Sequence, residues 1–191
     1  ARQAHRHPAR AVERRLTLHI DTATTELADA LADVAARTFP LACPPSSTSE
    51  DIDAFIAENL SADRFARYLT DPDRTVLAAR RDGRILGYAM TVRGVPDDPD
   101  VQRAVPLRPA IELSKMYVLP DCHGAGVSAA LMDAVVRYAS AQHAACVWLG
   151  VNQQNRRAQR FYGKHGFEVA GTKTFHLGAE IEHDYVMVRP A

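Results

Sequence analysis

Two spacings of apolar residues organise the first half of the chain. The segment Arg15 to Asp21 alternates apolar and polar side chains, which predicts a first strand. Apolar residues then recur at helical spacing from Thr25 to Phe39, from Ser49 to Leu60 and from Ser61 to Leu69, which predicts three helices. We expect the prolines that follow Phe39 to end the first helix, because proline removes a helical hydrogen bond.

The pattern changes at Thr75, where strand-like runs replace helical ones. Two runs between Thr75 and Gly94 are joined by Asp82-Gly83, a dipeptide that suits a tight hairpin turn because both residues accept positive φ. The segment 94–109 is rich in proline and aspartate and is expected to form a long solvated loop. Another strand is predicted to end at Pro120.

The clearest amphipathic helix of the chain begins at Val127. Further apolar residues follow at i+3, i+4, i+7, i+8 and i+11. The next segment, Cys146 to Val151, is nearly all apolar, as expected for a central strand buried on both faces. A helix that ends near Gly166 and two strands between Glu168 and Arg189 complete the chain. The strand–helix–strand unit predicts a right-handed crossover between parallel strands, and hence an α/β fold.

Composition and charge add few constraints. The 191 residues include 23 Lys plus Arg and 23 Asp plus Glu, so a net charge of zero gives no argument for a nucleic-acid or membrane partner. No apolar run approaches the roughly 20 residues that span a bilayer. Residues 1–14 are rich in Arg and His and lack the apolar core of a secretory signal. We expect a flexible arm at 1–14, with a nucleic-acid-binding arm as the alternative, and a single domain at 15–191.

The cysteines and histidines do not form a recognisable pattern. Cys43, Cys122 and Cys146 are odd in number and widely spaced, which fits neither a disulfide framework nor a zinc knuckle. The simplest compartment for such a chain is the reducing cytoplasm. The eight histidines are scattered along the sequence, so we predict no metal site.

The stretch HGAGVSAAL, from His123 to Leu131, lies between a predicted strand and a predicted helix. The first N–H groups of a helix have no intrahelical partner, and the helix dipole adds positive charge there. Gly124 and Gly126 allow an anion to approach the backbone, and Ser128 adds a hydroxyl donor. The stretch is neither a Walker A loop nor a dinucleotide fingerprint. It predicts a phosphate site or, alternatively, only a tight turn.

This stretch resembles the acyl-CoA motif of the GCN5-related N-acetyltransferase (GNAT) superfamily. In that motif a Gln or Arg is followed by two residues, Gly, one residue, and Gly or Ala. His123 and Ser128 depart from the pattern, although both can donate to phosphate. A second segment, VNQQNRRAQRFYGKHGF, is similar to another family element, with matching residues at Asn155, Ala158, Phe161, Tyr162, Gly166 and Phe167. Two motifs in the right order make the resemblance far more specific than one.

The resemblance implies a fold, a cofactor and a set of binding residues. The fold would be a mixed sheet of about six to seven strands flanked by helices, with acyl-CoA at a central splay between two strands. Acetyl-CoA would be the co-substrate, its pantetheine arm pairing with the backbone at the end of the strand and its diphosphate lying on the glycine turn. The implied binding residues are Met116, Tyr117, Val118, His123, Gly124, Ala125, Gly126, Val127, Ser128, Asn155 and Tyr162.

The same resemblance suggests catalytic roles for two residues. Glu112 lies six residues before Val118, and hence on the same strand face, and is our candidate general base. Tyr162 is our candidate general acid, because a phenol stays protonated at neutral pH. A solvated glutamate and a merely packed tyrosine are the alternatives. No histidine and acid accompany Cys122 or Cys146, so direct transfer is favoured over an acyl-cysteine route.

The segment from Thr38 to Pro72 and the ending FHLGAEIEHDYVMV are similar to the PaiA-like spermidine/spermine acetyltransferase branch. The implied substrate is a small primary amine, with a polyamine such as spermidine as a candidate. Spaced carboxylates for it are available at Glu50, Asp51 and Asp53 or at Glu180, Glu182 and Asp184, unless these are simply solvated. A protein N-terminal or lysine acetyltransferase and a non-catalytic acyl-CoA sensor are the alternatives. A monomer and a homodimer are both compatible with the sequence.

Overall fold

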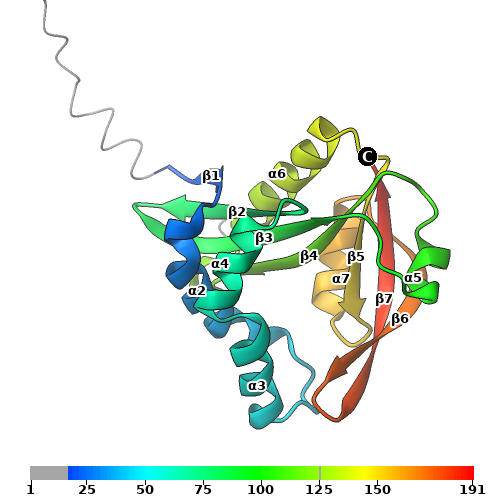
Figure 1. The fold of residues 1–191 in the computed structure, drawn as a ribbon, viewed down its shortest axis with the longest axis horizontal. Coiled ribbons are helices and arrows are strands. Elements are labelled where there is room, and N and C mark those ends of the chain that lie inside the picture. Colours follow the sequence, from blue (N-terminus) through cyan, green and yellow to red (C-terminus); the bar gives the residue numbers. More distant parts are fainter. Residues whose placement is uncertain (1–16, 125) are drawn as a thin grey trace, which may run out of the picture.

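A mixed β-sheet forms the centre of the protein (Figure 1). The computed structural model describes residues 17–124 and 126–191, and within them the sheet has seven strands in the order β1-β2-β3-β4-β5-β7-β6. The strands are β1 His19–Thr22, β2 Arg74–Arg81, β3 Arg84–Arg93, β4 Ala110–Val118, β5 Cys146–Asn152, β6 Glu168–Leu177 and β7 Glu180–Pro190. β4 and β5 run parallel, and the other neighbours are antiparallel. The predicted mixed sheet and its parallel pair are confirmed.

Helices flank this sheet on both faces. They are η1 Thr25–Leu27, α2 Ala28–Ala42, α3 Ser49–Asn59, α4 Ala62–Thr70, α5 Pro99–Ala104, η2 Pro120–Cys122, α6 Val127–Ala141 and α7 Arg156–Lys164. Several begin at a side chain that accepts from a backbone N–H, as Thr48 does for α3, Ser61 for α4 and Asn155 for α7. These caps explain why the helices start where the serines, threonines and asparagines of the sequence predict.

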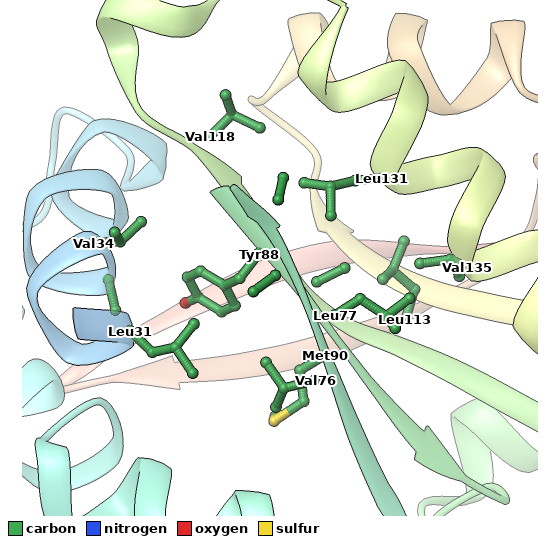
Figure 2. Close-up of a cluster of buried hydrophobic side chains, with 14 of the residues drawn as sticks. Leu31, Val34, Val76, Leu77, Tyr88, Met90, Leu113, Val118, Leu131 and Val135 are labelled. Carbon is green, nitrogen blue, oxygen red and sulfur yellow. The ribbon is translucent and has the colours of Figure 1, made fainter. Parts of the chain in front are cut away.

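The two longest helices cover opposite faces of the sheet. Leu31 of α2 lies toward the fully buried ring of Tyr88, whereas Leu131 and Val135 of α6 lie on the other side, toward Leu113 (Figure 2). Each fully buried side chain of this size contributes roughly 1.5–3 kcal/mol through removal of apolar surface from water. The amphipathic pattern that predicted α6 is therefore the pattern that fixes it against the sheet.

Strands β4 and β5 are paired over only part of their length. Ala110, Ile111 and Glu112 pair with residues 146–148, but β4 continues to Val118 without a partner on that side. The two strands therefore diverge after Glu112. This divergence is the central splay that the sequence resemblance implies.

Three local predictions were wrong or incomplete. Helix α2 runs through Pro40 and ends two residues later at Ala42, although the proline removes the hydrogen bond to the carbonyl of Ala36. The expected loop at 94–109 contains α5, for which Asp98 accepts from the N–H of Asp100 and Pro99 occupies the first turn. Strand β1 begins at His19, and the first two residues of its predicted range lie outside the described part of the chain.

The hairpin turn at Asp82-Gly83 is confirmed, with φ of 53° and 77° at its two residues. The expected arm at residues 1–14 lies outside the described residues, so the domain boundaries stay predictions. Among the described helices, none is both long and apolar enough to cross a membrane.

Candidate active site

A cavity of about 790 Å³ opens where β4 and β5 diverge. One end is bounded by the glycine turn and α7, and the other by β6, β7 and the ends of α2 and α3. The predicted site residues on its wall are Glu112, Met116, Tyr117, Val118, His123, Gly124, Gly126, Ser128, Asn155 and Tyr162. Val127 is instead buried in the core, and Ala125 lies outside the described residues. Residues far apart in the sequence thus meet around one space.

The glycine turn leaves the start of α6 open. Gly124 and Gly126 have φ of 81° and 78°, in the left-handed region that favours glycine. A Cβ added at either position would meet no atom of the described residues within 4 Å, so these residues leave the space beside both glycines free. Gly126 caps the helix without a side-chain hydrogen bond. The first N–H groups of a 15-residue helix therefore border the cavity, which is the arrangement that a phosphate group requires.

The backbone at the end of β4 also faces the cavity. The N–H of Leu119 donates to the carbonyl of Leu86 in β3, at 2.8 Å. Successive N–H groups of a strand point in opposite directions, so the N–H of Val118 points away from β3, toward the splay. Among residues 17–124 and 126–191, no strand pairs with β4 there. The backbone from Met116 to Val118 can therefore accept an extended amide chain as an additional strand edge.

The imidazole of His123 is held between two partners, and one of them was missed by the sequence analysis. Its Nδ1 lies 3.1 Å from Nη2 of Arg157, and its Nε2 lies 3.1 Å from the carbonyl oxygen of Val118. A guanidinium only donates, so Nδ1 accepts and Nε2 carries the proton. The ring has no free N–H for a phosphate, contrary to our expectation. The cation beside the turn is Arg157, which lies two residues after the predicted Asn155.

A β-bulge at Ser114 changes which side chains of β4 face the cavity. The residues on either side of Ser114 pair with adjacent residues of β3, so Ser114 is one residue extra. Glu112 consequently shares a face with Tyr117, whereas Val118 packs on the opposite face near Leu131 (Figure 2). The expectation that Glu112 and Val118 share a face is therefore wrong, although both line the cavity.

Glu112 is a half-buried carboxyl group among cations. Burial raises its pKa above the ordinary value, and the charges of Lys173, Lys115 and Arg74 oppose that effect without cancelling it. Burial likewise lowers the pKa of Lys115, whose ammonium lies 5.9 Å from the centre of the Tyr68 ring. A carboxylate with a raised pKa is a stronger base than a solvated one, so the site favours proton acceptance at Glu112.

Tyr162 lies on α7 with its ring packed between two others. The ring centres of Phe161 and Phe167 are 5.6 and 5.9 Å away. Burial raises the pKa of Tyr162 to about 12, so its hydroxyl is protonated at neutral pH. Within the described part of the chain, this hydroxyl makes no hydrogen bond. Tyr162 thus packs as an aromatic residue and still presents a free O–H donor at the cavity wall.

Of the carboxylates proposed for an amine substrate, two lie at the far end of the cavity and the others lie outside it. Glu182 and Asp184 line the cavity and are 9% and 8% exposed. Glu180, Glu50 and Asp53 are exposed, and half-buried Asp51 lies beside the β6–β7 turn outside the cavity. The sequence analysis missed three aromatic residues of this end, Phe39, Phe55 and Phe175, as well as Lys173.

The cysteines offer little as nucleophiles. Cys122 and Cys146 are buried outside the cavity wall, and burial raises the pKa of each. Cys43 does line the cavity, but burial and the charge of Glu182 raise its pKa to about 11. A thiol with such a pKa is almost entirely protonated at neutral pH. Among the described residues, no group of His, Cys, Asp and Glu is arranged to hold a metal ion.

Comparisons with known proteins agree with this geometry. The model of the Acetyltransferase (GNAT) family matches residues 28–167. Uncharacterised N-acetyltransferases of Mycobacterium bovis and Mycobacterium tuberculosis are each 59% identical over 162 residues, covering 85% of this chain and 96% of the relative.

Solved structures with the same fold have more distant sequences. The PaiA N-acetyltransferase of Thermoplasma acidophilum, solved with coenzyme A, is 18% identical with a TM-score of 0.72, covering 92% of this chain and 100% of that one. The ribosomal-protein-S18-alanine N-acetyltransferase of Escherichia coli is 19% identical with a TM-score of 0.63, covering 91% and 94%. At these identities the likeness shows a common fold and does not place the chain in the PaiA-like branch.

Proposed function

The chain belongs to the acetyltransferase (GNAT) family of acetyl-CoA-dependent N-acetyltransferases, and from this premise we propose that it acetylates the primary amine of a small molecule by direct transfer. One observation carries the proposal. A single cavity joins an open helix N-terminus at Gly126 to buried carboxylates at Glu182 and Asp184. The first feature suits a diphosphate, and the second suits an ammonium group.

The binding of acetyl-CoA is assigned to the backbone around the splay. We assign the diphosphate to the N–H groups at the start of α6, with the guanidinium of Arg157 beside them. The pantetheine amides would pair with β4 from Met116 to Val118, whose outward N–H groups lack a strand partner. Asn155 caps α7 through its side-chain oxygen and lies on the same cavity wall, where its amide nitrogen can donate to the pantetheine arm.

The chemistry needs an uncharged amine, a polarised carbonyl and a protonated leaving group. Acetyl-CoA supplies a thioester whose carbonyl carbon accepts the amine nitrogen as its bond to sulfur breaks. The N–H of Val118 donates to the carbonyl oxygen, where negative charge develops. Glu112 accepts the ammonium proton, directly or through water, and Tyr162 donates its proton to the sulfur. The second proton that the nitrogen loses on becoming an amide returns to the oxygen of Tyr162.

Removal of the ammonium proton is the step for which the site offers most help. An alkyl ammonium with a pKa of about 10.4 lies about 3.4 units above neutrality, which corresponds to roughly 4.6 kcal/mol. Transfer from water to this buried space disfavours the charged form of the amine. The raised pKa of Glu112 assists in the same direction, because it makes the carboxylate a better proton acceptor.

A protein substrate is less well supported than a small molecule. Phe55 of α3 lies 5.7 Å, ring centre to ring centre, from Phe175 of β6, so α3 covers the far end of the cavity. Figure 1 shows α3 beside the free end of the β6–β7 hairpin. This contact leaves little room for a polypeptide to cross the site. A polyamine, suggested by the PaiA-like sequence features, remains a candidate among small amines.

The test is a panel of amines with release of free coenzyme A as the readout. The proposal predicts amine-dependent thiol release and one acetyl group added to the amine. Tight binding of acetyl-CoA without acetylation of any amine would support the non-catalytic sensor instead. Acetylation of peptide N-termini but of no small amine would favour a protein substrate.

A further inference from the structure

The far end of the cavity has an apolar aromatic wall. Phe39 of α2 and Phe55 of α3 are stacked, with ring centres 4.6 Å apart and planes inclined by 10°. Phe175 of β6 meets Phe55 edge to face at 5.7 Å. Tyr117 of β4 adjoins the same wall, 6.4 Å from Phe39, so the rings run from the strand that ends at the splay to the β6–β7 hairpin. We call Phe39, Phe55 and Phe175 the aromatic wall.

One buried carboxylate lies directly beside this wall. Glu182 of β7 pairs across the strands with Phe175, so the two side chains lie on the same face of the sheet. Glu182 is 9% exposed and accepts a hydrogen bond of 3.3 Å from Nδ2 of Asn152. Within the described residues, no Lys, Arg or His nitrogen lies within 4 Å of it. A buried carboxylate without a cation is unfavourable, and a bound ammonium would remove that cost.

The other carboxylates of the cavity already have cations nearby. Asp184 forms an ion pair of 3.4 Å with Lys173, and both side chains are mostly buried. Glu112 is surrounded by the charges of Lys173, Lys115 and Arg74. Lys115 and Lys173 therefore place two ammonium groups on the cavity wall, and Nζ of Lys173 also lies 5.8 Å from the centre of the Phe175 ring. The second charge of a polycation would be repelled wherever it came near either lysine.

From this arrangement we infer that the acceptor is a primary amine with a single positive charge and an apolar, ring-sized body. The inference rests on the proposed acetyltransferase function. The ammonium first binds at Glu182 and passes its proton through water to Glu112 before the transfer. The ring packs against the aromatic wall, where edge-to-face and stacked contacts add to the gain from burial. The aromatic wall and the two lysine ammonium groups make spermidine a poor substrate, in contrast to the polyamine suggested by the sequence features.

The first arm of the test compares amines with the unaltered protein. Phenethylamine carries one charge and a ring, butylamine carries one charge and no ring, and spermidine carries several charges and no ring. We expect kcat/KM to be at least about tenfold higher for phenethylamine than for either of the others, mainly through KM. A value for spermidine equal to or above that for phenethylamine would overturn the inference. This comparison needs no variant, so it decides the question even where a substitution impairs folding.

The second arm tests the carboxylate with a matched pair of variants. Glu182→Gln should lower kcat/KM for phenethylamine by about 30-fold or more, because it removes one partner of a buried charge pair. Glu180→Gln changes an exposed glutamate two residues away on the same strand and should have no such effect. Calorimetry gives a second readout: Glu182→Gln should weaken the binding of phenethylamine and leave the Kd for acetyl-CoA unchanged. Equal behaviour of the two variants would contradict the inference.

Different results would contradict the proposed function and the inference about the substrate. If no amine is acetylated while acetyl-CoA binds, both the proposed function and the inference about its substrate are wrong. If amines are acetylated but spermidine is preferred and Glu182→Gln behaves as Glu180→Gln does, only the inference is wrong.

Discussion

The guanidinium of Arg157 lies 3.1 Å from the imidazole of His123, and together they link α7 to the glycine turn. The same imidazole reaches back to the carbonyl oxygen of Val118 at 3.1 Å. One ring therefore connects the cation beside the turn with the strand end that faces the splay. His123 acts on the site by positioning these two groups, because its own nitrogens are both engaged.

This link predicts a specific effect on acetyl-CoA binding. Arg157→Ala should raise the KM for acetyl-CoA by roughly tenfold, with a smaller change in kcat. The reason is that a charge-assisted hydrogen bond to phosphate contributes about 1.5–3 kcal/mol, and less where the pair is exposed. Initial rates at varied acetyl-CoA and varied salt measure it. Arg156→Ala is the matched control, since Arg156 is exposed on the same helix and does not line the cavity. Equal KM values for the two variants would contradict the assignment.

The glycine turn can be tested by separating backbone strain from loss of the anion site. Gly126→Ala should lower the free energy of unfolding by roughly 1–2 kcal/mol, because alanine is strained at φ of 78°. It should also weaken acetyl-CoA binding, because its methyl group enters the open space beside the helix N-terminus. Gly83→Ala carries the same strain at φ of 77° in the β2–β3 turn, outside the cavity. A similar loss of stability with unchanged acetyl-CoA affinity is expected for that control, measured by denaturant unfolding and calorimetry.

Tyr162→Phe tests the proposed proton donor. The substitution keeps the packing with Phe161 and Phe167 and removes only the hydroxyl, so stability should change little. We expect kcat to fall by about 10²-fold with an unchanged KM for acetyl-CoA, as for loss of a general acid. Tyr138→Phe removes a hydroxyl that bonds Thr75 away from the cavity, and it should leave kcat unaltered. Full turnover in Tyr162→Phe would exclude the role of Tyr162.

Burial of Tyr162 also predicts the alkaline behaviour of the enzyme. Because its pKa is raised to about 12, the hydroxyl remains protonated well above the ordinary range of tyrosine. The rate should therefore show no loss through ionisation of a tyrosine between pH 8 and about 10. A pH–rate profile of kcat with saturating substrates measures this.

Glu112→Gln should lower the activity without lowering the stability. The pKa of Glu112 is raised in the folded state, so its ionisation opposes folding, and its contribution to stability is lost as pH rises through that pKa. Replacement by glutamine should therefore leave the Tm at pH 7 equal or higher while kcat/KM falls by about 10²-fold. The acid limb of the wild-type pH profile should also disappear in this variant. A lower Tm at pH 7 together with a normal pH profile would contradict both parts of the argument.

Much of the fold follows from local patterns in the sequence. The caps at Thr48, Ser61 and Asn155 and the turn at Asp82-Gly83 act over a few residues, so their effects can be read directly. Helix α5 was missed because its short apolar side packs on the distant Trp148 cluster rather than repeating along a long helix. Without knowledge of this packing, the proline and aspartate that begin α5 look like residues of a loop.

The glycine turn was visible in the sequence because a helix N-terminus with two adjacent glycines needs no partner from elsewhere. The far end of the cavity was not, since Phe39, Phe55 and Phe175 meet only after three elements pack together. The bulge at Ser114 is equally hidden, because nothing in IELSKMYV marks the residue at which alternation changes. Only tertiary packing reveals such features.

A crystal structure with bound coenzyme A tests the central assignment most directly. The account predicts the diphosphate on the backbone N–H groups at the start of α6, the guanidinium of Arg157 beside it, and the pantetheine arm along β4 from Met116 to Val118. Coenzyme A bound away from that helix terminus, or with its sulfur outside the space between Val118 and Tyr162, would contradict it.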